Sequence, residues 1–328
     1  MDAADRLEVR ILVDNWIDML LPNVTGGRSD GKLADRCGLV HHFDPRELPP
    51  QAENGISFLV RVWRNDKSVS LLFDVGLTGT VLSHNLRVFR EDPSQLDHVL
   101  ISHGHPDHYG GITTLLAEVG RPIAVVTHPD AFLPRYAIMN EGQPSLYYNY
   151  GFTQQALEQA GARFVLATGP VELGWGTRTS GQIPREVEFE GPREPPFAGA
   201  PGLYQLRRDG QFGLDQVWDE QALLVDVASE GLVILTGCAH AGVVNTVRRS
   251  MQLFGNRPIR AVLGGFHLGF PTTPRENVDR TVKALKEHGV KTVVPMHCSG
   301  LPANVAFRQD CPDTYLQPSV GTLLTFGL

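Results

Sequence analysis

The residues best suited to do chemistry lie in one short segment, Ser102-His103-Gly104-His105-Pro106-Asp107-His108. Three histidines and one aspartate fall within six positions, between an apolar stretch and a helical pattern that opens with glycines. Imidazole and carboxylate groups together suit zinc, iron or manganese. Because alternate residues of an extended segment point to one side, His103 and His105 can face a common cavity, which Asp107 and His108 reach after the turn at Pro106. The spacing therefore indicates a metal site rather than a solvated polar loop.

Short apolar runs position this segment and place other polar residues at similar points. Strands are expected over residues 7–13, 56–62, 69–73, 98–101, 122–126, 222–227, 232–236, 261–264 and 292–294. Amphipathic helices are expected over residues 112–119, 243–254 and 275–288. Asp74, His240, His267 and His297 each follow an expected strand closely, as the histidine-rich segment does. Polar residues at strand ends are typical of functional sites.

The order of these elements predicts an α/β fold. Two halves, each with strands inside and helices outside, favour a four-layer αββα sandwich over a nucleotide-binding sheet, since no glycine-rich phosphate motif occurs. We expect one domain over residues 1–328. Residues 134–217 are rich in proline, glycine, aromatic residues and arginine, which predicts an insertion that covers the site.

The expected insertion carries side chains suited to an aromatic or anionic small molecule. Arg135, Tyr136, Trp175 and Arg185 are the candidate substrate contacts. The same side chains could instead pack the insertion onto the sandwich or form a homodimer contact.

The overall composition argues against several partners. The 328 residues hold 29 Lys and Arg against 36 Asp and Glu, and no basic cluster points to nucleic acid or an anionic membrane. No apolar run approaches the roughly 20 residues that a bilayer span needs. The acidic first residues do not resemble a signal peptide, and the four scattered cysteines favour a reduced state. We therefore expect a cytoplasmic protein that acts on a small molecule.

The sequence resembles the metallo-β-lactamase superfamily, whose first motif is H-x-H-x-D-H. Within it, the resemblance is to a branch of metal-dependent hydrolases that includes dihydropterin-ribofuranosylaminobenzene phosphate synthases of methanopterin biosynthesis. The segments that carry the resemblance beyond this motif include Leu72-Phe73-Asp74-Val75-Gly76, Thr236-Gly237-Cys238-Ala239-His240, Gly264-Gly265-Phe266-His267 and Pro295-Met296-His297-Cys298. The resemblance implies an αββα sandwich with one or two metal ions at the sheet edges.

The resemblance also implies a ligand set. His103 and His105 resemble ligands of one metal, Asp107 and His108 resemble ligands of a second, and His297 resembles the late ligand of the superfamily. The chain departs from the usual pattern at Cys238, which occupies the place of a bridging aspartate, and it has no histidine between His128 and His240. We expect His240 to act as the replacement ligand, with a supporting or substrate-contacting role as its alternative.

Three further residues have roles around these ligands. Asp74 is expected to accept the free N–H of a ligating histidine, although an ordinary turn aspartate is the alternative. Cys238 is expected beside the ligands rather than among them, with thiolate ligation as the other possibility. His267 remains open between a ligand, a proton shuttle and a buried core histidine.

The predicted reaction is hydrolysis of a small ester, lactone, phosphoester or activated aromatic, such as a halogenated ring, by a metal-activated hydroxide. Zinc is the expected ion, in one or two copies, with manganese or iron possible. Asp107 is expected to orient or deprotonate the attacking water, and His267 is the second candidate catalytic residue, as a proton shuttle. Two alternatives stay open, a synthase of the dihydropterin type and a non-catalytic metal or ligand sensor.

Overall fold

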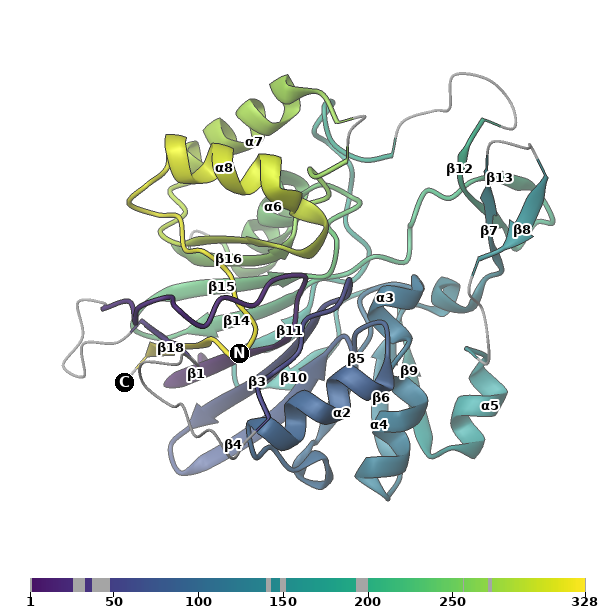
Figure 1. Ribbon diagram of the computed structural model, residues 1–328, viewed down its shortest axis with the longest axis horizontal. Helices are drawn as coiled ribbons and strands as arrows, with labels where there is room; N and C mark the ends of the chain where they lie inside the picture. The colour runs from purple at the N-terminus through teal and green to yellow at the C-terminus, as the bar shows by residue number, and fades with distance from the viewer. Residues whose placement is uncertain are drawn as a thin grey trace.

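Two β-sheets pack face to face, and helices cover both of their outer faces (Figure 1). The structure is a computed structural model, and it describes residues 2–25, 33–36, 48–139, 143–147, 152–192, 200–255, 257–270 and 273–327. The expected four-layer αββα arrangement is confirmed.

The first sheet has eight strands in the order β2-β18-β1-β3-β4-β5-β6-β9. Strands β1, β3 and β4 are antiparallel neighbours, whereas β4, β5, β6 and β9 run parallel. Their bounds are β1 Arg6–Val13, β2 Ala34–Asp35, β3 Ser57–Arg64, β4 Lys67–Phe73, β5 His98–Leu100, β6 Ile123–Thr127, β9 Ala162–Leu166 and β18 Leu323–Gly327.

The second sheet has six strands in the order β10-β11-β14-β15-β16-β17. Strands β15, β16 and β17 are parallel, and the others pair antiparallel. Their bounds are β10 Glu172–Gly174, β11 Thr177–Thr179, β14 Leu223–Val227, β15 Gly231–Thr236, β16 Ile259–Gly265 and β17 Val293–Met296.

Three hydrophobic clusters hold the layers together. Residues such as Phe58, Leu71 and Leu263 fill the space between the two sheets. A second cluster packs α6, α7 and α8 on the six-stranded sheet, and a third packs α2 and α4 on the eight-stranded sheet. The helices are α2 Gly79–Val88, α3 Pro106–Tyr109, α4 Ile112–Val119, α5 Gln154–Gln159, α6 Val243–Phe254, α7 Arg275–Glu287 and α8 Gly300–Asp310, with short 3-10 helices η1 Pro93–Gln95, η2 Pro129–Phe132 and η3 His297–Ser299.

The range 134–217 differs from the expected insertion. Strand β9 extends the eight-stranded sheet, and β10 and β11 extend the six-stranded sheet, so part of this range builds the sandwich itself. Its two ends form a separate four-stranded sheet in the order β13-β12-β7-β8, at the upper right of Figure 1. These strands are β7 Arg135–Ile138, β8 Pro144–Leu146, β12 Gly202–Leu206 and β13 Phe212–Leu214. Residues 140–142, 148–151 and 193–199 lie outside the described residues.

The strands of the small sheet were not predicted, and the reason is physical. They are short, and prolines and glycines interrupt the sequence around them. Each pairs either with a strand far away in the sequence or with another short strand of the same kind. By contrast, the expected helices at 112–119 and 243–254 coincide with α4 and α6, because glycines bound a clear apolar period there.

The parallel strands bring the predicted site together. β4 and β5 run parallel, as do β15, β16 and β17, so their carboxyl ends lie at the same edge of each sheet. The polar segments that follow these strands therefore lie at that edge. Four residues at these ends have left-handed backbone angles, namely Asp74 (φ 58°), Ala239 (φ 54°), His267 (φ 51°) and His297 (φ 47°). Non-glycine residues rarely adopt this conformation, and such outliers cluster at functional sites. In the described part of the chain, no helix is both long enough and apolar enough to cross a bilayer.

The buried contact between the sheets can be tested with Phe58, which is fully buried and whose ring lies 6.1 Å from that of Phe73. Replacing Phe58 with alanine should lower the free energy of unfolding by about 3–5 kcal/mol, because it leaves a cavity in the core. Urea denaturation measures this change. The variant Leu20→Ala, at a side chain that is 73% exposed, should change stability by less than about 0.5 kcal/mol.

Candidate metal centre

A first cluster joins His103, His105 and His240, whose potential ligand atoms all lie within 4.8 Å of one another. The first two follow β5, and His240 follows β15 in the other sheet. The ring of His240 lies 4.8 Å from that of His103 and 4.9 Å from that of His105. The cluster therefore lies where the two sheets meet.

The hydrogen bonds around this cluster leave ring nitrogens facing one another without a proton between them. Ser102 Oγ donates to Asp74 Oδ2 at 2.7 Å, so it can only accept from His103 Nδ1 at 2.9 Å. His105 Nε2 lies 3.2 Å from Asp215 Oδ2 and donates its proton there. The lone pairs of His103 Nε2 and His105 Nδ1 then face each other at 3.1 Å. A cation between these nitrogens removes that repulsion, so the donor set fits a metal ion.

His240 completes the fit. Its Nε2 is buried and has no hydrogen-bond partner among the described residues. A buried polar atom without a partner is costly, and coordination to a metal would satisfy it. Burial lowers the pKa of His103 and of His240 well below the usual value, and the neighbouring imidazoles lower both pKa values further. Both rings are therefore neutral near pH 7, which is the form that binds metals.

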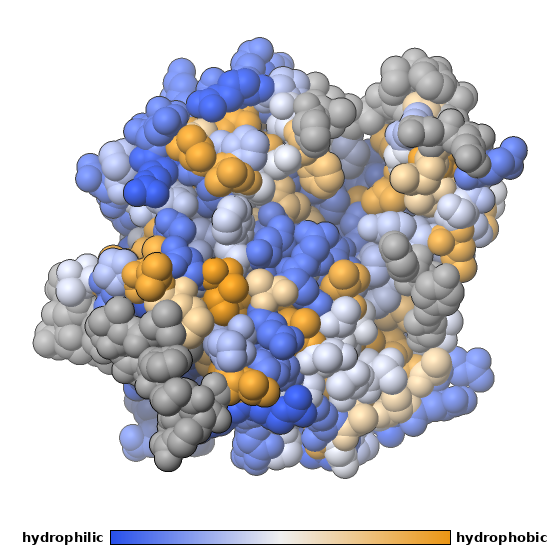
Figure 2. Space-filling model, viewed as in Figure 1, coloured by the Kyte–Doolittle hydropathy of each residue, from blue (hydrophilic) through white to orange (hydrophobic). Residues whose placement is uncertain are grey.

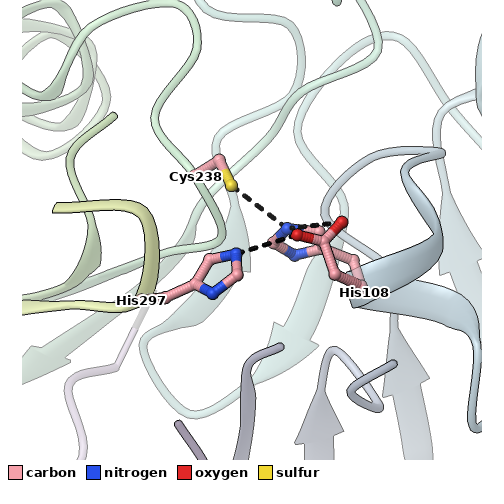
Figure 3. Close-up of side chains that lie close together, drawn as sticks. His108, Cys238 and His297 are labelled. Carbon is pink, nitrogen blue, oxygen red and sulfur yellow. Dashed lines mark hydrogen bonds and ion pairs between the residues drawn. The ribbon is translucent and has the colours of Figure 1, made fainter. Parts of the chain in front are cut away.

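A second cluster joins Asp107, His108, Cys238 and His297, again with all potential ligand atoms within 4.8 Å. His108 Nε2 lies 3.1 Å from Cys238 Sγ, and His297 Nε2 lies 3.0 Å from Asp107 Oδ2. Figure 3 shows Cys238, His108 and His297 converging from three separate segments. Nitrogen, oxygen and sulfur donors in one small set suit zinc.

Asp74 and Ser102 connect the two clusters. Asp74 Oδ2 accepts from His108 Nδ1 at 2.7 Å, and Asp74 Oδ1 accepts from the backbone N–H of Ser102 at 2.7 Å. Through the Ser102 hydroxyl, the same carboxylate orients His103. Asp74 thus accepts from the ring of His108 in the second cluster, and its supporting role at a metal stays a prediction. A side chain on Gly237 would lie 2.2 Å from Ser102 Oγ, so only glycine leaves room for this arrangement.

His297 is held by the end of β1. Asp14 Oδ1 accepts from its backbone N–H at 2.9 Å. Asn15 Nδ2 donates to the His297 carbonyl at 3.1 Å, which turns Asn15 Oδ1 toward His297 Nδ1 at 3.2 Å. The amide therefore accepts the Nδ1 proton and leaves Nε2 for the cluster.

The structure distributes two predicted residues differently from the sequence interpretation. His240 lies in the first cluster, whereas we expected it as a replacement for the bridging aspartate, which would contact both ions. Cys238 lies in the second cluster, with its Sγ 3.1 Å from His108 Nε2, so thiolate ligation stays open beside the expected supporting role. Sequence reasoning missed Ser102, Asn15 and Asp215. The position of Asn15 two residues after a strand was a usable signal, whereas nothing in the local sequence marks Asp215.

A cavity of about 410 Å³ opens against the first cluster. His105, His240 and His267 form one wall, and the His267 ring lies 4.2 Å from that of His240 and 4.4 Å from that of Phe270. The remaining wall is mostly apolar, with Phe189, Leu203, Leu214, Val217, Phe266 and Leu268 among its side chains. Burial lowers the pKa of His267 to about 3, so this ring is neutral. Figure 2 shows the surface hollowed between the upper helical layer and the small sheet, which presents hydrophobic residues there.

The four predicted substrate contacts do not gather at this cavity. Arg135 is buried and forms ion pairs with Asp215 and Asp219. Tyr136 packs against Phe212 within the small sheet. Trp175, between β10 and β11, packs against the core between the sheets, which indicates a packing role. The Arg185 guanidinium lies 4.0 Å from the ring of Trp218 and donates to Gln216.

Glu190 joins the cavity wall to α6. Its two carboxylate oxygens accept from the backbone N–H groups of Val244 and Asn245, both at 2.8 Å, at the first turn of the helix. Burial raises the pKa of Glu190 from 4.5 to about 7, although these two hydrogen bonds oppose the rise.

The number of bound metal ions should match the two clusters, with one ion in each. In protein dialysed against a weak chelator and then loaded with zinc, we expect two bound ions per chain. His240→Ala and Cys238→Ala should each lose about one, from different clusters, because each variant removes a ligand from one cluster only. Elemental analysis counts the ions. His84→Ala, at a half-buried ring that contacts the Pro49 carbonyl, is the control and should keep both. Full occupancy in both ligand variants would refute the site.

The raised pKa of Glu190 predicts a pH dependence of stability. Between about pH 4.5 and 7 the folded chain binds more protons at Glu190 than the unfolded chain, so this group lowers stability as pH rises. Relative to the wild type, Glu190→Gln should therefore gain about 1–3 kcal/mol between pH 4.5 and 8. Urea denaturation at several pH values measures the gain. The exposed Glu188→Gln is the control, and an equal slope there would contradict the prediction.

Comparisons with known proteins identify the family of this chain. A family model described as the metallo-beta-lactamase superfamily matches residues 53–248. A protein of Methanocaldococcus jannaschii named 7,8-dihydropterin-6-methyl-4-(beta-D-ribofuranosyl)-aminobenzene-5'-phosphate synthase is 31% identical over 288 residues, which covers 88% of this chain and 95% of that protein. A second, uncharacterized protein of the same organism is 31% identical over 258 residues, or 79% of this chain and 88% of its own length.

A solved structure gives a similar result. The crystal structure of a metal-dependent hydrolase of the beta-lactamase superfamily superposes with a TM-score of 0.68 at 25% identity, and the match covers 98% of this chain and 99% of that one. The family model and the two relatives each span most of the chain, including the histidine-rich segment. The chain therefore belongs to the metallo-beta-lactamase superfamily.

Proposed function

We propose that this chain is a metal-dependent hydrolase that acts on an uncharged, mostly apolar small molecule, such as an ester, a lactone or an activated aromatic compound. The observation that carries the proposal is the wall of the 410 Å³ cavity beside His105 and His240. Among its described lining residues there is no lysine or arginine, and most of the lining side chains are apolar. Such a wall favours a neutral ligand.

Each residue of the two clusters has a proposed role. His103, His105 and His240 would hold one ion, and Asp107, His108, Cys238 and His297 would hold the second. Bound there, zinc would lower the pKa of water and polarise the substrate oxygen, which supplies a nucleophile at neutral pH. Asp107, whose Oδ2 lies 3.0 Å from His297 Nε2, would orient water, and the neutral His267 ring lines the cavity, where it would contact the substrate.

A synthase is the second candidate, because the relative that bears that name shares 31% identity over 88% of this chain. That name includes a phosphate, and a phosphate-binding site favours free cationic side chains. The two arginines that the sequence analysis suggested as substrate contacts do not provide them. Arg135 is paired with two carboxylates, and Arg185 is held by Gln216 and Trp218. These contacts favour the hydrolase.

A substrate panel tests the proposal. Zinc-loaded protein should hydrolyse neutral aryl esters or aryl lactones, and it should lose the activity on chelation and regain it with zinc. His240→Ala should lower kcat/KM by at least about 100-fold, since a ligand replacement acts at least as strongly as loss of a supporting contact. His84→Ala should match the wild type.

Other results on the panel would contradict the proposal. A clear preference for aryl phosphates over aryl esters would count against a neutral substrate. Product formation only in the presence of a second organic acceptor would favour the synthase. Binding of panel compounds without metal-dependent turnover would favour a sensor.

A further inference from the structure

A buried ion network lies behind the first metal cluster. Arg135, the first residue of β7, donates from Nε to Asp215 Oδ2 at 2.7 Å and from Nη2 to Asp219 Oδ1 at 2.6 Å. Its remaining nitrogen, Nη1, donates to the carbonyl of Ala131 at 3.1 Å. The three charged residues are at most 4% exposed. The guanidinium is therefore fully used inside the protein.

Both carboxylates of this network also contact the segment that carries the first two ligands. Asp219 Oδ2 accepts from the backbone N–H of Gly104 at 2.7 Å. Asp215 Oδ2 accepts from His105 Nε2 at 3.2 Å. Gly104 permits this approach, because a Cβ at that position would lie 2.0 Å from the Ala131 carbonyl oxygen and 2.3 Å from Arg135 Nη1. The network is thus built against the ligand segment.

The contact with Asp215 has a consequence for the ring of His105. A neutral imidazole has one N–H, and a carboxylate beside Nε2 holds that hydrogen there. Nδ1 then has its lone pair free, and it is Nδ1 that faces His103 Nε2 inside the first cluster. Without this acceptor the ring could adopt the other tautomer, which points an N–H at the ion.

We propose that Asp215 and Asp219, joined by Arg135, are positioning residues for the first metal cluster. Asp215 fixes the tautomer and orientation of His105, and Asp219 fixes the backbone between His103 and His105. Arg135 begins β7 and Asp215 directly follows β13, so the small sheet contributes to the metal centre as well as to the cavity wall. The inference rests on the proposed metal centre, but not on the proposed substrate.

The experiment compares Asp215→Ala, Asp215→Asn and wild type by cobalt titration in competition with a chelator. Cys238 lies in the second cluster only, so the thiolate-to-cobalt absorption band reports that cluster, while total cobalt reports both. Asp215→Ala should bind cobalt at the first cluster about 10- to 100-fold more weakly and leave the thiolate band unchanged. Asp215→Asn, which keeps an acceptor of the same shape, should show a smaller loss.

Nitrogen-15 NMR of the metal-free protein gives a second readout, which a purely structural role would not change. In the wild type His105 should carry its proton on Nε2, and in Asp215→Ala it should shift toward the Nδ1-protonated form. His105→Gln identifies the signals. Arg260→Gln, which breaks the part-buried ion pair with Glu230, is the matched control and should alter neither readout.

The outcomes separate this inference from the proposed function. Unchanged first-cluster affinity in Asp215→Ala, or an equal loss at both clusters, would overturn the inference. If Asp215→Ala does not fold, the nitrogen-15 spectrum of the wild type decides, and a His105 ring that carries its proton on Nδ1 would overturn the inference. If the wild type binds no metal at all, the proposed function fails, and the tautomer of His105 still decides the present proposal.

Discussion

The candidate metal centre depends on one constraint. A histidine must give its single ring hydrogen to an acceptor so that its other nitrogen is free for a metal. Asp74 accepts that hydrogen from His108, Ser102 accepts it from His103, and Asp215 accepts it from His105. Without these acceptors, each ring would populate two tautomers. In one of them an N–H group points at the cluster and excludes a cation. The acceptors are therefore as much a part of the site as the ligands.

The fold meets this constraint by bringing distant segments to one edge. Parallel strands of both sheets end beside one another, so polar residues that follow β4, β5, β15 and β17 meet in a small volume. The sharp change of chain direction there places Asp74 and His297 in left-handed backbone conformations. Packing between the sheets maintains these strained residues, which links the hydrophobic core to the chemistry.

The sequence was sufficient for the parts of the site that are local. The histidine-rich segment has a spacing that few structural roles explain, and glycines bound the helices that became α4 and α6. The sequence could not assign His240 to the first cluster, because that assignment depends on which strand ends lie closest across two sheets. Asp215 was beyond reach for a similar reason, since it comes from a region of short strands whose pairing no local pattern predicts.

The position of Arg135 changes how the cavity should be understood. An arginine in an irregular segment suggested an anion-binding residue, yet two buried carboxylates neutralise it and leave a net negative charge in this group of three. Burial alone would raise the pKa of Asp215, but Arg135 and His105 outweigh burial and hold that pKa below its usual range. The carboxylate therefore stays ionised beside His105, where it would repel an anionic substrate. The ion network that we propose positions His105 would thus also disfavour phosphate in the cavity, which agrees with the proposed neutral substrate.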